Sequence, residues 1–169
     1  LMYWQVYLHK TVLSAEFLLA KILERAREIL LSGSKLFVVP SLKILLSQKI
    51  TSVNISQIDF LKSFSKVDDY DVFTCVKIWC DSQDKIISSL SKMMIERKLP
   101  KVKISAQKFS LEEVENCKSV HQKNLGFNNE EMNYFVYQKE MENNAYDPRK
   151  DEIKILFNDG SLKDITQAS

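Results

Sequence analysis

The sequence predicts a mainly α-helical chain with a small antiparallel β-sheet near its C-terminus, which is an α+β fold class. Two observations lead to this prediction. Residues 2–32 contain no Gly or Pro and consist largely of good helix formers. Alternating and β-branched runs, which are typical of strands, gather after residue 96. We therefore divide the chain into a helical region, residues 1–96, and a small α+β lobe, residues 97–169.

The first predicted helix covers residues 2–32. Its apolar residues cover a wide arc, which indicates packing on more than one side. Gly33 follows, and Gly commonly ends a helix. Pro40 suits the first turn of a short second helix. The predicted buried side of that second helix consists of Leu42, Ile44, Leu45 and Leu46.

Three more helices are expected before residue 97. Residues 52–66 offer Ser56 as an N-cap, and their apolar residues recur at helical spacing. That apolar face consists of Ile58, Leu61 and Phe64. Residues 68–82 begin with acidic side chains, which favour a helix N-terminus. Residues 82–98 form the last of these helices, and Pro100 marks its end.

The lobe is expected to combine strands with one helix. Residues 101–105, "KVKIS", alternate polar and apolar side chains, and residues 133–141, "NYFVYQKEM", are aromatic and β-branched. Ser110 and Glu113 form a capping box at the start of a helix. Residues 151–165 read as a hairpin around the turn Asn-Asp-Gly-Ser.

Composition excludes several classes of protein. A formal charge of +2 over 169 residues argues against a nucleic-acid binder. Three scattered cysteines and two histidines argue against a disulfide framework and a zinc site. No apolar run reaches about 18 residues, so we expect no membrane span, and we expect the protein to be cytoplasmic.

Catalytic motifs are absent from the sequence. The three glycines lie far apart, so there is no glycine-rich phosphate loop, and no GxSxG sequence occurs. Paired carboxylates sit at predicted helix starts, where they complement the helix dipole. We assign no catalytic residue and no metal ligand to this chain.

Three weak signals point to anion binding. Tyr3, Tyr7 and Lys10 share one helix face, which suits either a phosphorylated ligand or a buried aromatic pair with a snorkelling lysine. His9 beside them can donate to phosphate or satisfy a backbone carbonyl. A basic group from Arg97 to Lys103 reads as a ligand site or as a solvated helix end. Lys139 lies on a predicted strand.

These signals occur together in one known family. The pattern "VYLHKTV..AE.LL...L.RA" in residues 6–26 resembles the helix after the catalytic motif of HD-domain phosphohydrolases, in particular the deoxynucleoside-triphosphate (dNTP) triphosphohydrolases. "DDYDVFTCVKIWCDSQDKIISSLSKMMIERKLPKV" in residues 68–102 resembles the family's next helices and its Arg-x-Leu-aromatic-Lys motif. "NNAYDPRKDEIKILFNDGSLKDITQAS" in residues 143–169 resembles the C-terminal signature of bacterial members.

The resemblance implies that this chain is the C-terminal portion of a larger enzyme. The family holds a divalent metal, Mg, Mn or Fe, through a His…His-Asp…Asp set that lies upstream of the matched region. This sequence has no His-Asp dipeptide. The resemblance therefore implies a metal-dependent parent that cleaves dNTP to deoxynucleoside and tripolyphosphate. It also implies that this chain alone holds no metal and is inactive.

The resemblance also implies roles for individual residues. Tyr7 matches a tyrosine on the wall of the substrate pocket. A regulatory nucleotide such as dGTP or GTP, held between subunits of a homo-oligomer, would contact residues that match His9, Lys10, Arg97, Lys101 and Lys139. Pro100 replaces the aromatic residue of the family motif, which puts a base-stacking contact there in doubt. The alternative reading is a non-catalytic helical module for nucleotide sensing or oligomerisation.

Overall fold

The computed structural model describes residues 9–48, 58–140, 154–157 and 160–164. The chain divides into two compact units, Leu1–Tyr137 and Gln138–Ser169. This division falls later in the chain than residue 96, where the sequence places its boundary. The first unit contains the apolar core, and residues as late as Met132 contribute to it.

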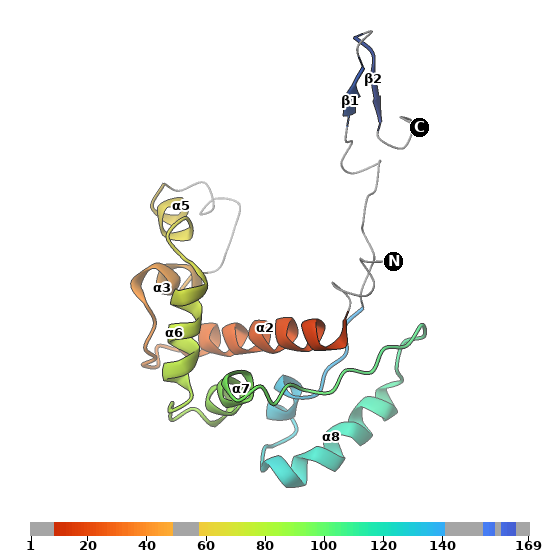
Figure 1. Ribbon diagram of the computed structural model, residues 1–169. Coiled ribbons are helices and arrows are strands. Elements are labelled where there is room, and N and C mark those ends of the chain that lie inside the picture. Colours follow the sequence, from red (N-terminus) through yellow and green to blue (C-terminus); the bar gives the residue numbers. More distant parts are fainter. Residues whose placement is uncertain (1–8, 49–57, 141–153, 158–159, 165–169) are drawn as a thin grey trace. The chain divides into compact units, whose positions relative to one another are not determined.

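Helix α2, Lys10–Leu31, is the longest element that the structure describes (Figure 1). Its buried stripe runs through Leu18, Ile22, Ala26 and Ile29, at steps of three and four residues. The predicted ending at Gly33 is confirmed. Gly33 has a φ of 78°, and the amides of Gly33 and Ser34 bond back to the carbonyls of Leu30 and Ile29, each at 3.1 Å. This is a Schellman motif, which needs a left-handed residue.

Four shorter helices follow, namely α3 (Pro40–Leu46), α5 (Ile58–Phe64), α6 (Asp69–Trp79) and α7 (Lys85–Ile95). Asp68 and Asp84 cap α6 and α7, and each accepts a hydrogen bond from the amide three residues later at 2.9 Å. Helix α7 packs against α2 and α6, and α3 packs against α2 and α5 (Figure 1).

The core lies where α2, α3, α6 and α7 meet. Its buried members outside α2 are Val38, Leu42, Leu46, Cys75, Val76, Trp79, Ile86, Ile87, Leu90, Phe127 and Met132. Trp79 is fully buried, and its indole Nε1 donates to the carbonyl of Phe37 at 2.7 Å. This bond anchors the segment between α2 and α3 to α6.

The predicted capping box is confirmed at α8, Leu111–Leu125, because Ser110 and Glu113 each bond the other's backbone amide. A 3₁₀ helix, η1 (Glu131–Tyr134), follows α8. In the second unit, β1 (Lys154–Leu156) pairs antiparallel with β2 (Leu162–Asp164), and Ile155 lies opposite Lys163. This confirms the predicted hairpin.

The α+β fold class is wrong, because the expected sheet of the C-terminal lobe does not form from residues 101–105 and 133–140. The described chain is mainly helical, and its strands are limited to that one hairpin of three-residue strands. Residues 101–105 form no strand, and residues 133–140 contain the end of η1 and irregular chain. The aromatic residues of this segment pack on helices instead, since Phe135 stacks on Phe127 with ring centroids 4.7 Å apart. Tertiary packing therefore overrides the local strand propensity.

Helix α3 begins at Pro40, as predicted, but only part of its predicted buried side lies in the core. Leu42 and Leu46 are buried, Leu45 is half-buried, and Ile44 is exposed. The two buried residues are four positions apart, which is one helical turn, so a single narrow stripe of this short helix meets the core.

Helix α5 is present, as the helical spacing of its apolar residues predicts, but that apolar face does not lie in the core. Ile58, Leu61 and Phe64 are exposed, whereas Phe60 is buried. Ser56, the predicted N-cap, lies outside the described residues. Within the described part of the chain, no helix is both long enough and apolar enough to cross a membrane.

Candidate functional site

Two of the predicted site residues open helix α2. His9 is the N-cap, and its Nδ1 accepts a hydrogen bond from the amide of Thr11 at 3.3 Å. Lys10 is the first residue of the helix, and both side chains are exposed. His9 therefore has a local structural role, and Lys10 is available to a ligand. Tyr7 lies outside the described residues.

Arg97 and Lys101 lie in the segment that follows α7. The amides of Arg97 and Lys98 bond to the carbonyls of Met94 and Met93, at 3.3 and 2.9 Å. This is a second Schellman motif, but its left-handed position holds Arg97, with a φ of 57°. A side chain in this conformation costs about 1 kcal/mol compared with Gly. Backbone strain of this kind is concentrated at functional positions.

A partly buried hydrogen bond joins these two regions. The hydroxyl of Ser14, which is 4% exposed, donates to the carbonyl of Pro100 at 2.6 Å. Ser14 lies one turn after Lys10 on α2, and Pro100 lies between the two predicted cations of the second segment. The structure thus brings the start of α2 beside residues 97–101, although 86 residues separate the bonded pair.

The joined region is basic. Lys10, Arg97 and Lys101 are exposed, and none of them forms an ion pair with the residues that the structure describes. Unpaired, solvated cations on adjacent segments attract a polyanion. Lys139 is exposed and belongs to the second unit, so it stays a separate prediction.

A second cluster, which sequence reasoning missed, surrounds Arg25 on α2. Its guanidinium bonds both carboxylate oxygens of Asp84, at 2.7 and 3.3 Å, and also bonds Glu28 at 3.0 Å. The phenol of Tyr134 donates to Glu28. Arg25 and Lys21 lie over the Tyr134 ring, 5.5 and 5.6 Å from its centroid.

The hydrogen bonds within this cluster shift the pKa values of three of its members. The hydrogen bond to Asp84 raises the pKa of Arg25. Burial works to raise the pKa of Asp84, but bonds from Arg25 and the α7 backbone outweigh it and lower that pKa. Burial and the bond to Glu28 raise the pKa of Tyr134 to about 12, so its phenol stays protonated. We interpret the cluster as a structural brace of α2, α7 and η1.

A metal centre does not fit the described residues. Across residues 9–48, 58–140, 154–157 and 160–164, no three His, Cys, Asp or Glu side chains are grouped so that they could hold a metal ion. We therefore derive no catalytic step through a metal in this chain.

The chain is similar in structure and in sequence to a phosphohydrolase of known structure. No family model matches it. It is similar to the solved structure of a phosphohydrolase from Bacteroides thetaiotaomicron VPI-5482, with a TM-score of 0.81 and 38% identity over 99% of this chain. It is also 32% identical, over 99 residues and 58% of its length, to the uncharacterized protein YwfO of Bacillus subtilis (strain 168). The chain spans 42% of the first protein and the match spans 21% of the second.

Replacing Asp84 by Asn tests the brace. Asn caps a helix as well as Asp does, so the change removes the charge and retains the cap of α7. We expect the free energy of unfolding at pH 7 to fall by about 1–2 kcal/mol. Because the folded-state pKa of Asp84 lies below its ordinary value of 3.8, its contribution is present above that pH and is lost as the pH falls through the folded-state pKa. Urea denaturation from pH 7 to pH 3 measures both effects.

The control for this prediction is Asp81→Asn, which changes an exposed carboxylate three residues earlier. It should alter the free energy of unfolding by less than about 0.5 kcal/mol. A deficit of Asp84→Asn that stays constant down to pH 3 would show that the charge of Asp84 does not stabilise the fold.

Replacing Ser14 by Ala tests the contact between α2 and residues 97–101. We expect the free energy of unfolding to fall by about 1 kcal/mol, and the amides of Lys98, Leu99 and Lys101 to exchange faster with solvent. Hydrogen exchange with mass spectrometry measures the second effect. Ser88→Ala is the matched control, because the Ser88 hydroxyl donates to the Cys80 carbonyl at 2.5 Å. Equal exchange in the two variants would show that Ser14 does not hold the segment.

Proposed function

We propose that this chain is the C-terminal portion of a metal-dependent HD phosphohydrolase that converts dNTP to deoxynucleoside and tripolyphosphate. The observation that carries the proposal is the similarity, over 99% of the chain, to a protein named a phosphohydrolase. The order of the three sequence patterns in residues 6–26, 68–102 and 143–169 supports the narrower assignment to triphosphohydrolases.

In this proposal the chain supplies binding surfaces. Tyr7 forms part of the wall of the substrate pocket, and a divalent metal in the HD domain, outside this chain, supplies Lewis-acid chemistry. His9, Lys10, Arg97, Lys101 and Lys139 contact a regulatory nucleotide. The ammonium and guanidinium groups bond its phosphates, and a nucleotide shared between subunits favours the homo-oligomer.

The Ser14–Pro100 hydrogen bond supports this assignment. His9, Lys10, Arg97 and Lys101, which the resemblance groups at one nucleotide site, come from two segments that this bond holds together, whereas Lys139 belongs to the second unit. Arg97 occupies a backbone position that Gly would fill without strain, which is consistent with a side chain retained for binding. His9 also caps α2, so its ring is held close to Lys10 by a local bond.

Hydrolysis assays test the proposal directly. The intact parent and residues 1–169 are incubated in parallel with each dNTP and Mg²⁺ or Mn²⁺, with and without GTP, and tripolyphosphate is measured. We expect release by the parent and none by residues 1–169. Release of tripolyphosphate by residues 1–169 would contradict the proposal that the catalytic residues lie in the HD domain outside this chain. No release from any nucleotide would remove the triphosphohydrolase assignment and favour a non-catalytic nucleotide-sensing module.

Replacing Lys10 by Ala in the intact parent tests the regulatory site. Because Lys10 is exposed and forms no ion pair with the residues that the structure describes, we expect a change in stability below about 0.5 kcal/mol. Loss of one charged contact to phosphate should raise the GTP concentration needed for half-maximal assembly by about tenfold. Mass photometry across a GTP titration measures this. Lys85→Ala is the control, since Lys85 is the exposed first residue of α7. An unchanged GTP dependence would exclude Lys10 from the site.

A further inference from the structure

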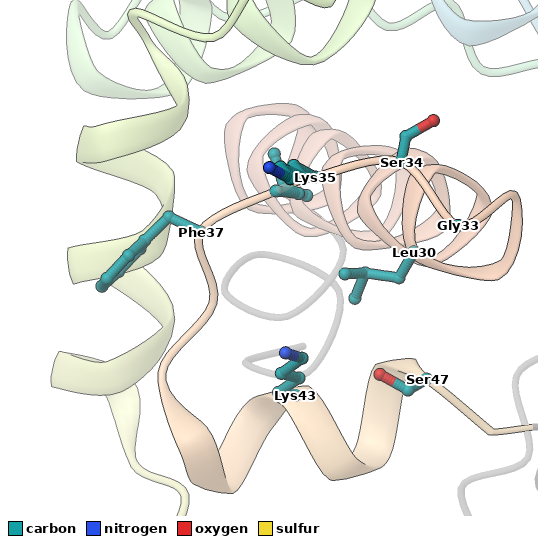
Figure 2. Close-up of a pocket in the computed structure, with 8 residues that line it drawn as sticks. Leu30, Gly33, Ser34, Lys35, Phe37, Lys43 and Ser47 are labelled. Carbon is teal, nitrogen blue, oxygen red and sulfur yellow. The ribbon is translucent and has the colours of Figure 1, made fainter.

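A groove separates the end of α2 from α3, on a part of the chain that the proposed function does not use. It encloses about 530 Å³ and is lined by Leu30, Gly33, Ser34, Lys35, Leu36, Phe37, Lys43 and Ser47. Figure 2 shows Lys43 and Ser47 on α3 and Leu30 pointing into the space between the two helices. Phe37 points away from both lysines, so it offers them no aromatic platform (Figure 2).

The charged side chains that line this groove are positive. Lys35 and Lys43 are the ionisable residues among its described lining residues, and that lining contains no carboxylate. Neither lysine forms an ion pair with any residue of the described ranges. A neighbouring hollow of about 880 Å³ shares residues 34–37, including Lys35, and adds Arg25 together with the carboxylates of Glu28, Asp81 and Asp84. The segment 34–37 therefore divides a cationic groove from one that carries carboxylates.

The walls of the groove are fixed before any ligand binds. The Schellman motif at Gly33 holds one end of the segment, and the bond from Trp79 to the carbonyl of Phe37 holds the other. Leu42 and Leu46 anchor α3 in the core, and Lys43 and the C-cap Ser47 each follow one of them by one residue, so both lie beside the buried stripe and line the groove. A preformed site loses less entropy on binding than a mobile one.

The donors suit an oxyanion with several oxygens. Two ammonium groups come from different walls of the groove, and the Ser47 hydroxyl forms no hydrogen bond within the described residues. The backbone amides of Lys35 and Leu36, two residues of the lining, bond no acceptor in the described chain. Ammonium, hydroxyl and amide donors together are the usual partners of phosphate.

We propose that this groove binds a phosphate-bearing anion through Lys35, Lys43 and Ser47. The anion is recognised by its phosphate groups, which bridge the two walls. Free polyphosphate and the phosphate chain of a nucleotide share this chemistry. The inference does not depend on the proposed function, because none of these residues belongs to the α2 start or to the segment after α7.

Residue-specific lysine footprinting tests this proposal on the intact protein. Amine acetylation of each lysine is followed by mass spectrometry at constant ionic strength, with tripolyphosphate or GTP as the probe. We expect both probes to slow acetylation of Lys35 and Lys43 saturably, by about tenfold, while Lys77 and Lys85 react as before. Protection of Lys10 and Lys101 reports the proposed regulatory site separately, so either site can fail alone.

Three variants distinguish binding of the anion in the groove from a general effect of ionic strength on lysine acetylation. Lys43→Ala should remove most of the protection of Lys35, and Ser47→Ala should weaken it, while Lys85→Ala leaves it unchanged. Thermal melting confirms that each variant is folded. The proposal is overturned if neither probe protects Lys35 and Lys43, if Lys77 and Lys85 are protected to the same degree, or if GTP protects them and tripolyphosphate does not.

Discussion

The large apolar side chains of Leu18, Ile22 and Ile29 on α2 are buried in the core, and α7 packs along this helix. Each such side chain contributes about 1.5–3 kcal/mol when buried, so together they outweigh any single ion pair on this surface. Ala26 on α2 and Ser91 on α7 are fully buried and small, which allows the two helices to lie close. Apolar burial thus sets the distance, and the Arg25–Asp84 pair restricts how α7 can slide along α2.

Both proposed binding regions depend on α2, one at the start of the helix and one at its end. Residues 97–101 leave the end of α7 and return to the start of α2 through Ser14, and residues 33–37 leave the end of α2 and are held by Trp79. A change that separates α2 from α7 would therefore displace Lys101 from Lys10 as well. A loss of packing between α2 and α7 would therefore lower both the stability of the fold and the affinity for a ligand at this region.

Local signals in the sequence predicted the helices well, whereas the strands and the site depended on distant contacts. Gly33, Pro40 and the Ser110–Glu113 box act within one turn, so their effect can be read without knowledge of the fold. Residues 101–105 form no strand, because alternation over five residues does not specify a partner strand. The proximity of the first turns of α2 to residues 97–101 depends on the bond from the Ser14 hydroxyl to the Pro100 carbonyl across 86 residues, which no local pattern encodes. The brace was missed for the same reason, since its members on α2, α7 and η1 are distant in sequence.

The two Schellman motifs differ in whether the sequence predicts their left-handed residue, which is Gly33 in one and Arg97 in the other. Gly33 adopts a positive φ at no steric cost, and the turn it makes is recognisable from its identity. Arg97 adopts the same region, and nothing in its identity announces this. Because the strain of about 1 kcal/mol is retained by the surrounding bonds, any ligand that holds the Arg97 side chain would stabilise a conformation that the backbone alone disfavours. A binding partner at Arg97 would therefore act on the end of α7, and through Pro100 and Ser14 on the start of α2.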